Sequence, residues 1–264
     1  MKERVITAII ALVLFIPIVI YGGWLLQVVV YGLSSIALFE LLRMRKIPTI
    51  SWASLISLLL LWIVLYQGTV IHLPIVENLA KSELVMFGVL LLLAYMVLKK
   101  NTFTYDDIGF ILTSILYVGM GFYFFILTRE AGIEYLLYVL LIIWATDTGA
   151  YFVGRAMGKH KLWPEISPKK TIEGSVGGIL LAILVAVIFQ IVDPFPFSLF
   201  IVVIVTILAS VVGQIGDLVE SAIKRHYDVK DSGNILPGHG GILDRFDSLI
   251  FMLPFLHFIG FISI

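Results

Sequence analysis

The sequence predicts an all-α, polytopic integral membrane protein with about nine transmembrane helices. Composition is the first indication, because 60% of the 264 residues are hydrophobic and only 14% are charged, outside the range of soluble domains. Apolar runs approaching the roughly 20 residues that a spanning helix needs recur along the whole chain. These runs are continuously apolar and do not alternate with polar residues, so they predict helices and not barrel strands.

The first predicted span follows a basic N-terminal tip and is joined to the second by Gly22–Gly23, which predicts a tight turn. The tip and apolar run look like a signal peptide, but no small-residue cleavage site follows, so we interpret the run as a retained helix. The expected spans are Val5–Tyr21, Trp24–Leu42, Ile50–Tyr66, Leu84–Leu98, Ile108–Leu127, Tyr135–Val153, Ser175–Val192, Phe197–Val212 and Ser248–Ile262.

The distribution of cationic residues predicts the orientation of these helices. Sixteen of the 18 lysine and arginine residues lie in connections on one side of the predicted bundle, and only Lys81 and Arg129 lie on the other. Because lysine and arginine are enriched in cytoplasmic loops, the N-terminus is expected in the cytoplasm and the C-terminus outside. The protein is therefore expected in the cytoplasmic (inner) membrane.

The chain is expected to form one membrane domain. Residues 1–134 would supply the N-terminal helices, and residues 135–264 the C-terminal helices with the polar site. Two long polar loops, Gly154–Gly174 and Gly213–Asp247, lie on the predicted cytoplasmic side. The chain contains no cysteine, which excludes disulfides, a thiol nucleophile and cysteine-ligated metal sites.

The segment from Ser221 to Asp247 is polar and charged, unlike the apolar runs that flank it. It contains four acidic residues, four lysines or arginines, two histidines and four glycines. Such a concentration of charge close to lipid is costly, so we interpret the segment as part of an active site.

A helix is expected to continue from the eighth span through Gly213–His226. On it Asp217, Ser221 and Lys224 follow at i, i+4 and i+7 and share one face. A solvated helix end is the alternative, with Glu220 and Lys224 as an ordinary i,i+4 pair, and Glu220→Ala is expected to be nearly silent if that pair is only a surface one. Asp217 favours function, because it lies about one turn beyond the apolar run, where an unpaired carboxylate is expensive.

The next segment, Asp228–Gly241, is rich in glycine and proline, which predicts a shaped loop. Glycine lets backbone N–H groups approach phosphate oxygens, and Lys230 or His239 would add positive charge. A flexible connector is the alternative, since no P-loop pattern is present.

The last span begins with Asp244, Arg245 and Asp247. Asp244 and Asp247 are at i and i+3, so both carboxylates can face one point. Together with Asp217 they offer hard oxygen ligands, which Mg²⁺ prefers alongside substrate phosphates and water. Helix capping is the competing explanation, because the helix dipole favours acidic residues at an N-terminus.

Two further stretches on the predicted cytoplasmic side contribute candidates. The segment D-T-G-A-Y begins with Asp147 inside the sixth span, where an acid indicates either function or an interhelical hydrogen bond. Lys169 and Lys170 lie in the segment S-P-K-K-T-I-E-G. These lysines would hold the loop inside, contact anionic lipid headgroups or contact nucleotide phosphates.

The order and spacing of the polar residues resemble the full signature of the phosphatidate cytidylyltransferases, also called CDP-diacylglycerol synthases. The D-T-G-A-Y and S-P-K-K-T-x-E-G segments and the nine-span layout resemble this family as well, whereas the first 140 residues resemble it mainly as generic membrane helices. The signature positions are Ser221, Lys224, Arg225, Lys230, Asp231, Gly233, Pro237, His239, Gly240, Gly241, Asp244, Arg245 and Asp247.

The resemblance implies transfer of the cytidylyl group from CTP to phosphatidate, giving CDP-diacylglycerol and pyrophosphate in phospholipid biosynthesis. Our mechanistic hypothesis is in-line attack by a phosphatidate oxygen on the α-phosphorus of CTP. A phosphate monoester is mostly ionised at neutral pH, so the nucleophile needs no general base.

Asp217 and Asp244 would bind Mg²⁺, alone or with a second cation, and Asp247 would be a further ligand or lie beside one. Basic side chains would neutralise phosphate charge, as phosphoryl transfer requires. The expected catalytic residues are Asp217, Asp244, Lys224 and Arg225, and the expected substrate-binding residues are Ser221, Lys230, His239, Arg245, Lys169, Lys170 and Asp147.

The expected partners are CTP, phosphatidate in the cytoplasmic leaflet and other membrane lipids, but no nucleic acid. Gly177–Gly178 can support close helix contacts within one chain or between two, and a homodimer is the common default among oligomers.

An ion or solute transporter is the alternative from another class, with Asp147 and Asp217 lining a pathway. Against it, polar residues gather on one side, and apolar stretches such as Leu136–Ile143 contain no ionisable relay. A nearer alternative is a CTP-dependent enzyme that acts on another lipid, such as an isoprenoid-ether phosphate cytidylyltransferase or a polyprenol kinase.

Overall fold

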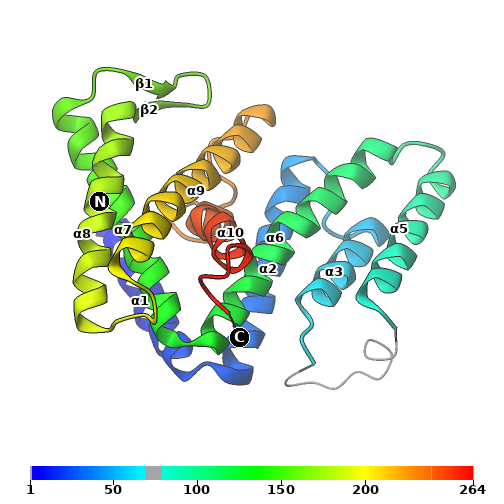
Figure 1. The fold of residues 1–264 in the computed structure, drawn as a ribbon. Coiled ribbons are helices and arrows are strands. Elements are labelled where there is room, and N and C mark those ends of the chain that lie inside the picture. Colours follow the sequence, from blue (N-terminus) through cyan, green and yellow to red (C-terminus); the bar gives the residue numbers. More distant parts are fainter. Residues whose placement is uncertain (1, 69–78, 239, 264) are drawn as a thin grey trace. The chain divides into compact units, whose positions relative to one another are not determined.

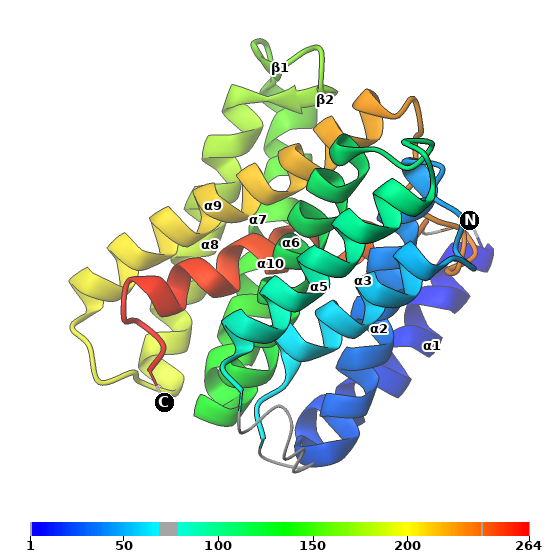
Figure 2. The same cartoon turned by 90° about the vertical axis from the view of Figure 1, so that its right-hand side faces the viewer.

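The computed structural model describes residues 2–68, 79–238 and 240–263, which are almost entirely helical (Figure 1 and Figure 2). In this part of the chain, each of the nine predicted spans overlaps one helix. The helices are α1 (Lys2–Tyr21), α2 (Gly23–Met44), α3 (Trp52–Leu65), α5 (Lys81–Leu98), α6 (Tyr105–Ala131), α7 (Ile133–Met157), α8 (Ile172–Val192), α9 (Leu199–His226) and α10 (Leu243–Phe258).

Six of the described helices are long and apolar enough to cross a bilayer: α2, α5, α6, α7, α8 and α9. Helix α3 is apolar but has only 14 residues, and α10 has 16. The prediction of an all-α polytopic membrane protein is confirmed, and the count of nine transmembrane helices stays a prediction.

The chain divides into two compact units. Unit 1 comprises residues 1–126 and 231–243, and unit 2 comprises residues 127–230 and 244–264. The polar segment 221–247 therefore contributes its middle part to unit 1 and both of its ends to unit 2. The predicted division of the chain after residue 134 stays a prediction.

Within unit 2, α8 lies against both α7 and α9. One face of α8 carries small buried residues, including Gly174, Gly178 and Ala182. Its other face exposes Leu180, Leu184 and Ile188 at i, i+4 and i+8. Large aliphatic residues outside and small residues at the helix interface are typical of packing in lipid, where close backbone contact replaces the hydrophobic effect.

The contact between α7 and α8 is too close for side chains at its centre. A Cβ atom on Gly149 would lie 2.6 Å from the carbonyl oxygen of Gly177, and one on Gly178 would lie 2.5 Å from that of Thr146. Gly177–Gly178 thus serves a contact within one chain, as the sequence allowed. The glycine of the D-T-G-A-Y segment places Asp147 beside the start of α8.

Hydroxyl pairs join α7 to α9 in the same unit. The hydroxyls of Tyr138 and Thr206 are 2.6 Å apart, and those of Thr146 and Ser210 are 2.8 Å apart. Such pairs satisfy polar groups that would otherwise face hydrocarbon. They fix the two helices that carry Asp147 and Asp217.

The loop predicted at residues 154–174 contains structure that the sequence did not indicate. Helix α7 continues to Met157, and an antiparallel hairpin of β1 (Lys161–Trp163) and β2 (Ser167–Thr171) follows. The hairpin ends at α8, where the Thr171 hydroxyl accepts the N–H of Gly174 at 3.1 Å as an N-cap. Lys169 and Lys170 therefore lie on a strand directly beside the helix pair.

Candidate active site

The predicted face of α9 is present in unit 2. Helix α9 is continuous to His226, and the Ser221 hydroxyl donates to Asp217 Oδ1 at 3.4 Å. Lys170, which lies on β2, places its Nζ 2.5 Å from Asp217 Oδ2. The hairpin therefore supplies the cation that pairs with Asp217.

One turn further along α9, Lys224 holds two carboxylates. Its Nζ lies 2.6 Å from Asp244 Oδ1 at the start of α10, and it also pairs with Glu220 one turn back on α9. The Lys224 side chain is 13% exposed, and those of Asp244 and Glu220 are 7% and 0% exposed. Glu220 and Lys224 therefore form a buried pair and not a solvated surface pair. The condition under which Glu220→Ala is expected to be nearly silent is not met.

A cavity of about 380 Å³ opens between α7, α8, α9 and the hairpin. Asp147 and Asp217 line it with the cationic residues Arg155, Lys169 and Lys170. Its volume falls within the range of small-molecule sites, and its charges suit an anionic ligand that is accompanied by a cation. Arg155, which the sequence placed only among residues that set orientation, is thus a further candidate for substrate binding.

Three carboxylates of this unit, those of Asp147, Asp217 and Asp247, lie close enough to interact electrostatically with one another. Lys170 and Arg245 offset part of the charge around Asp147. Among the described residues, no three acidic or histidine side chains converge tightly enough to enclose a metal ion by themselves. An open arrangement of one or two carboxylates is nevertheless what Mg²⁺ uses when substrate phosphates complete its shell.

The remaining candidates are less closely joined to this cluster. Arg225 is exposed, and its Nε donates to the Ile166 carbonyl in the hairpin turn at 3.4 Å. Lys230 is exposed on the segment after α9. His239 lies outside the described residues.

The predicted glycine-rich loop is a loop in the structure, and its described part includes an isolated bridge between Leu236 and Gly240. Gly238 and Gly240 have φ values of 75° and 84°, which residues other than glycine adopt only with strain. The glycine content of this loop is therefore partly a backbone requirement.

Sequence comparison places this site within a family. Residues 2–263 match the sequence model of the cytidylyltransferase family. A phosphatidate cytidylyltransferase of Bacillus subtilis is 52% identical over 262 residues, which cover 98% of this chain and 97% of that relative. Phosphatidate cytidylyltransferases of Staphylococcus haemolyticus and Staphylococcus saprophyticus are 49% and 50% identical, each over 97% of this chain and 98% of the relative.

These matches include the N-terminal helices, so the similarity is wider than the C-terminal motifs indicated. The chain belongs to the cytidylyltransferase family.

Proposed function

We propose that this membrane enzyme transfers the cytidylyl group of CTP to phosphatidate, with CDP-diacylglycerol and pyrophosphate as products. Identity near 50% over almost the whole chain to relatives named phosphatidate cytidylyltransferase supports this activity. The observation that carries the choice of residues is the pairing of each central carboxylate with a lysine, Lys170 with Asp217 and Lys224 with Asp244.

These ion pairs suggest how the site accommodates two anionic substrates. Each lysine is partly enclosed, and an aspartate balances its charge. Incoming phosphate groups would compete for Lys170 and Lys224, with Lys169 and Arg155 adding charge from the cavity wall. The cationic groups would then stabilise the charge that develops on the departing pyrophosphate.

The acidic residues fit a divalent cation that arrives with the nucleotide. Asp217 and Asp244 would hold it once their lysines contact phosphate, and Asp147 and Asp247 are further oxygen donors of the same unit. When bound, Mg²⁺ would draw the phosphates together and polarise the α-phosphoryl group. Ser221, hydrogen-bonded to Asp217, would hold that carboxylate in position.

We further propose that this site faces the cytoplasm, where CTP is available. The positive-inside pattern, which predicts a cytoplasmic position for the lysine-rich hairpin, supports this orientation. Phosphatidate would then approach from the cytoplasmic leaflet with its phosphate at the interface. A homodimer is also part of the proposal, and cross-linking in membranes tests it.

Label transfer from CTP separates this activity from its nearest alternatives. Purified protein in detergent would receive phosphatidate micelles and CTP labelled at either the α- or the γ-phosphate. Cytidylyl transfer carries only the α-label into lipid, whereas a lipid kinase carries only the γ-label. An isoprenyl phosphate acceptor in a parallel reaction tests lipid choice. Folded protein that transfers neither label to phosphatidate would contradict the proposal. Label in the isoprenyl acceptor would then favour another lipid substrate, and label in neither acceptor would favour transport.

A further inference from the structure

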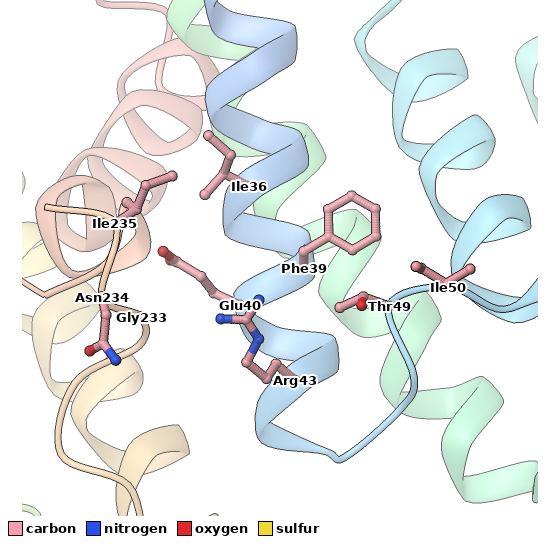
Figure 3. Close-up of a pocket in the computed structure, with 9 residues that line it drawn as sticks. All are labelled: Ile36, Phe39, Glu40, Arg43, Thr49, Ile50, Gly233, Asn234 and Ile235. Carbon is pink, nitrogen blue, oxygen red and sulfur yellow. The ribbon is translucent and has the colours of Figure 1, made fainter.

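A buried acid on α2 contacts the glycine-rich loop of the signature. Glu40 is only 4% exposed, and it belongs to unit 1 together with residues 231–243. In Figure 3 its side chain points from α2 toward Gly233, Asn234 and Ile235. A cavity of about 620 Å³ lies beside it, lined also by Arg43 on the next turn of the helix.

The Glu40 carboxylate accepts at least three hydrogen bonds from this region. Oε1 accepts the Ile242 N–H at 2.8 Å, and Oε2 accepts the Leu243 N–H at 2.9 Å and the Ser232 hydroxyl at 3.1 Å. Leu243 is the first residue of α10, where backbone N–H groups lack partners within the helix and a negative charge is favoured. Glu40 therefore caps a helix that begins 203 residues later in the chain.

The glycines of the loop are fitted to this carboxylate. The three atoms that a Cβ on Gly233 would meet first all belong to Glu40, with Oε1 at 2.5 Å. Gly233 is not among the residues with left-handed backbone, so an alanine is conformationally allowed there. A Cβ on Gly241 would overlap both Glu40 and Ser232. At Gly233 it is the acid, and not the backbone, that excludes a side chain.

We propose that Glu40 is a positioning residue that fixes the loop 231–243 for the CTP phosphates and sets the start of α10. Asp244 directly follows Leu243 in the chain, so the cap also determines where this candidate catalytic carboxylate enters the helix. This inference gives the N-terminal helices a part in the reaction and rests on the proposed function.

The first test measures the mobility of the loop with a spin label and needs no activity assay. The chain has no cysteine, so Asn234→Cys creates a single labelling site for a nitroxide on an exposed loop residue. The label should become more mobile in Glu40→Gln, whose amide nitrogen cannot accept a hydrogen bond, and still more mobile in Glu40→Ala.

Asp107→Asn is the matched control, because Asp107 is a carboxylate of unit 1 that pairs with Arg45 at 2.9 Å and lies outside the loop. Its spectrum should match that of the Asn234→Cys parent. Identical spectra for Glu40→Ala and the parent would overturn the inference, whatever the lipid substrate is.

The second test is kinetic and uses the same purified proteins. Glu40→Gln should raise the KM for CTP and lower kcat, with a combined loss on the order of tenfold to a hundredfold, while the KM for phosphatidate stays unchanged. A protein that is merely less stable would keep both KM values and the wild-type kcat per folded molecule, and this outcome would contradict a positioning role.

Gly233→Ala supplies a rescue test that does not depend on the stability of one variant. In the wild-type background the added methyl group would push against Glu40 and mobilise the Asn234→Cys label. In the Glu40→Ala background the same methyl group has room, so it should add no further change, and the two substitutions should be strongly non-additive. Additive effects would show that Gly233 and Glu40 act independently and would overturn the inference.

Discussion

Lys224 is the cation shared by two buried carboxylates of unit 2. It pairs with Asp244 and Glu220, and all three side chains are largely or wholly buried. Without Glu220 the lysine would keep its pair with Asp244 but would lose one of its two buried charge-assisted contacts. The residue that looks least important in the sequence, Glu220, is therefore expected to matter.

Glu220→Ala tests this point. The substitution removes one of the two carboxylates that contact Lys224 and leaves a space beside it, so we expect the free energy of unfolding to fall by about 1–3 kcal/mol. Thermal unfolding in detergent measures the change, with Glu165→Ala as control because Glu165 is exposed on the hairpin. A melting temperature equal to that of the wild type would show that Glu220 is solvated after all.

At the residue scale, the sequence predicts those contacts that the geometry of a single helix determines. Asp217 and Ser221 share a face because they are four residues apart on one helix, and their contact at 3.4 Å follows from that spacing. The Lys170–Asp217 pair depends on a hairpin, and the Glu40 contacts join residues up to 203 positions apart. No local pattern encodes such contacts, and the one signal that Glu40 gave in the sequence is its place as an acid inside the predicted span Trp24–Leu42.

At the scale of elements, the close approach of α7 and α8 positions the acidic residues. Gly149 faces backbone atoms, which cannot move aside as a side chain can. Gly109 on α6, in contrast, has no atom within 4 Å of the position that an added methyl group would take. The two glycines thus allow the same substitution to be compared in crowded and open surroundings.

Gly149→Ala should force α7 and α8 apart and reduce both thermal stability and cytidylyl transfer, because Asp147 lies two residues before the contact. Gly109→Ala should keep activity and raise stability by up to about 1 kcal/mol, since alanine favours helix over glycine. Melting curves and label transfer on both variants give the measurement. Equal behaviour of the two variants would contradict the packing described for Gly149.

Elements differed in how well the sequence indicated them. The long helices follow directly from apolar runs, and α10 begins one residue before Asp244, close to the predicted start. The hairpin β1–β2 was missed because its strands are short and polar and show no alternation that would distinguish them from a loop.

At the scale of the whole molecule, the helices alone do not determine which side of the membrane each connection faces. The charge pattern predicts that the hairpin lies in the cytoplasm and that the connection near Lys81 lies outside. Since the chain has no cysteine, single cysteines at the exposed residues Glu165 and Ser82 report the two sides.

An impermeant thiol reagent should label Ser82→Cys in intact cells, and Glu165→Cys only after the cells are permeabilised. The reverse pattern would place the candidate site on the outer side and contradict access to cytoplasmic CTP.

The most direct test of the chemistry is label transfer from α-labelled CTP into phosphatidate across a Mg²⁺ titration. Wild-type protein would be compared with Asp217→Ala, Asp244→Ala and the exposed-aspartate control Asp106→Ala. We predict Mg²⁺-dependent transfer by the wild type and the control, and none by the other two variants at any Mg²⁺ concentration, although both remain folded. If Asp244→Ala keeps most of its activity across the titration, the assignment of this carboxylate to the metal site is wrong.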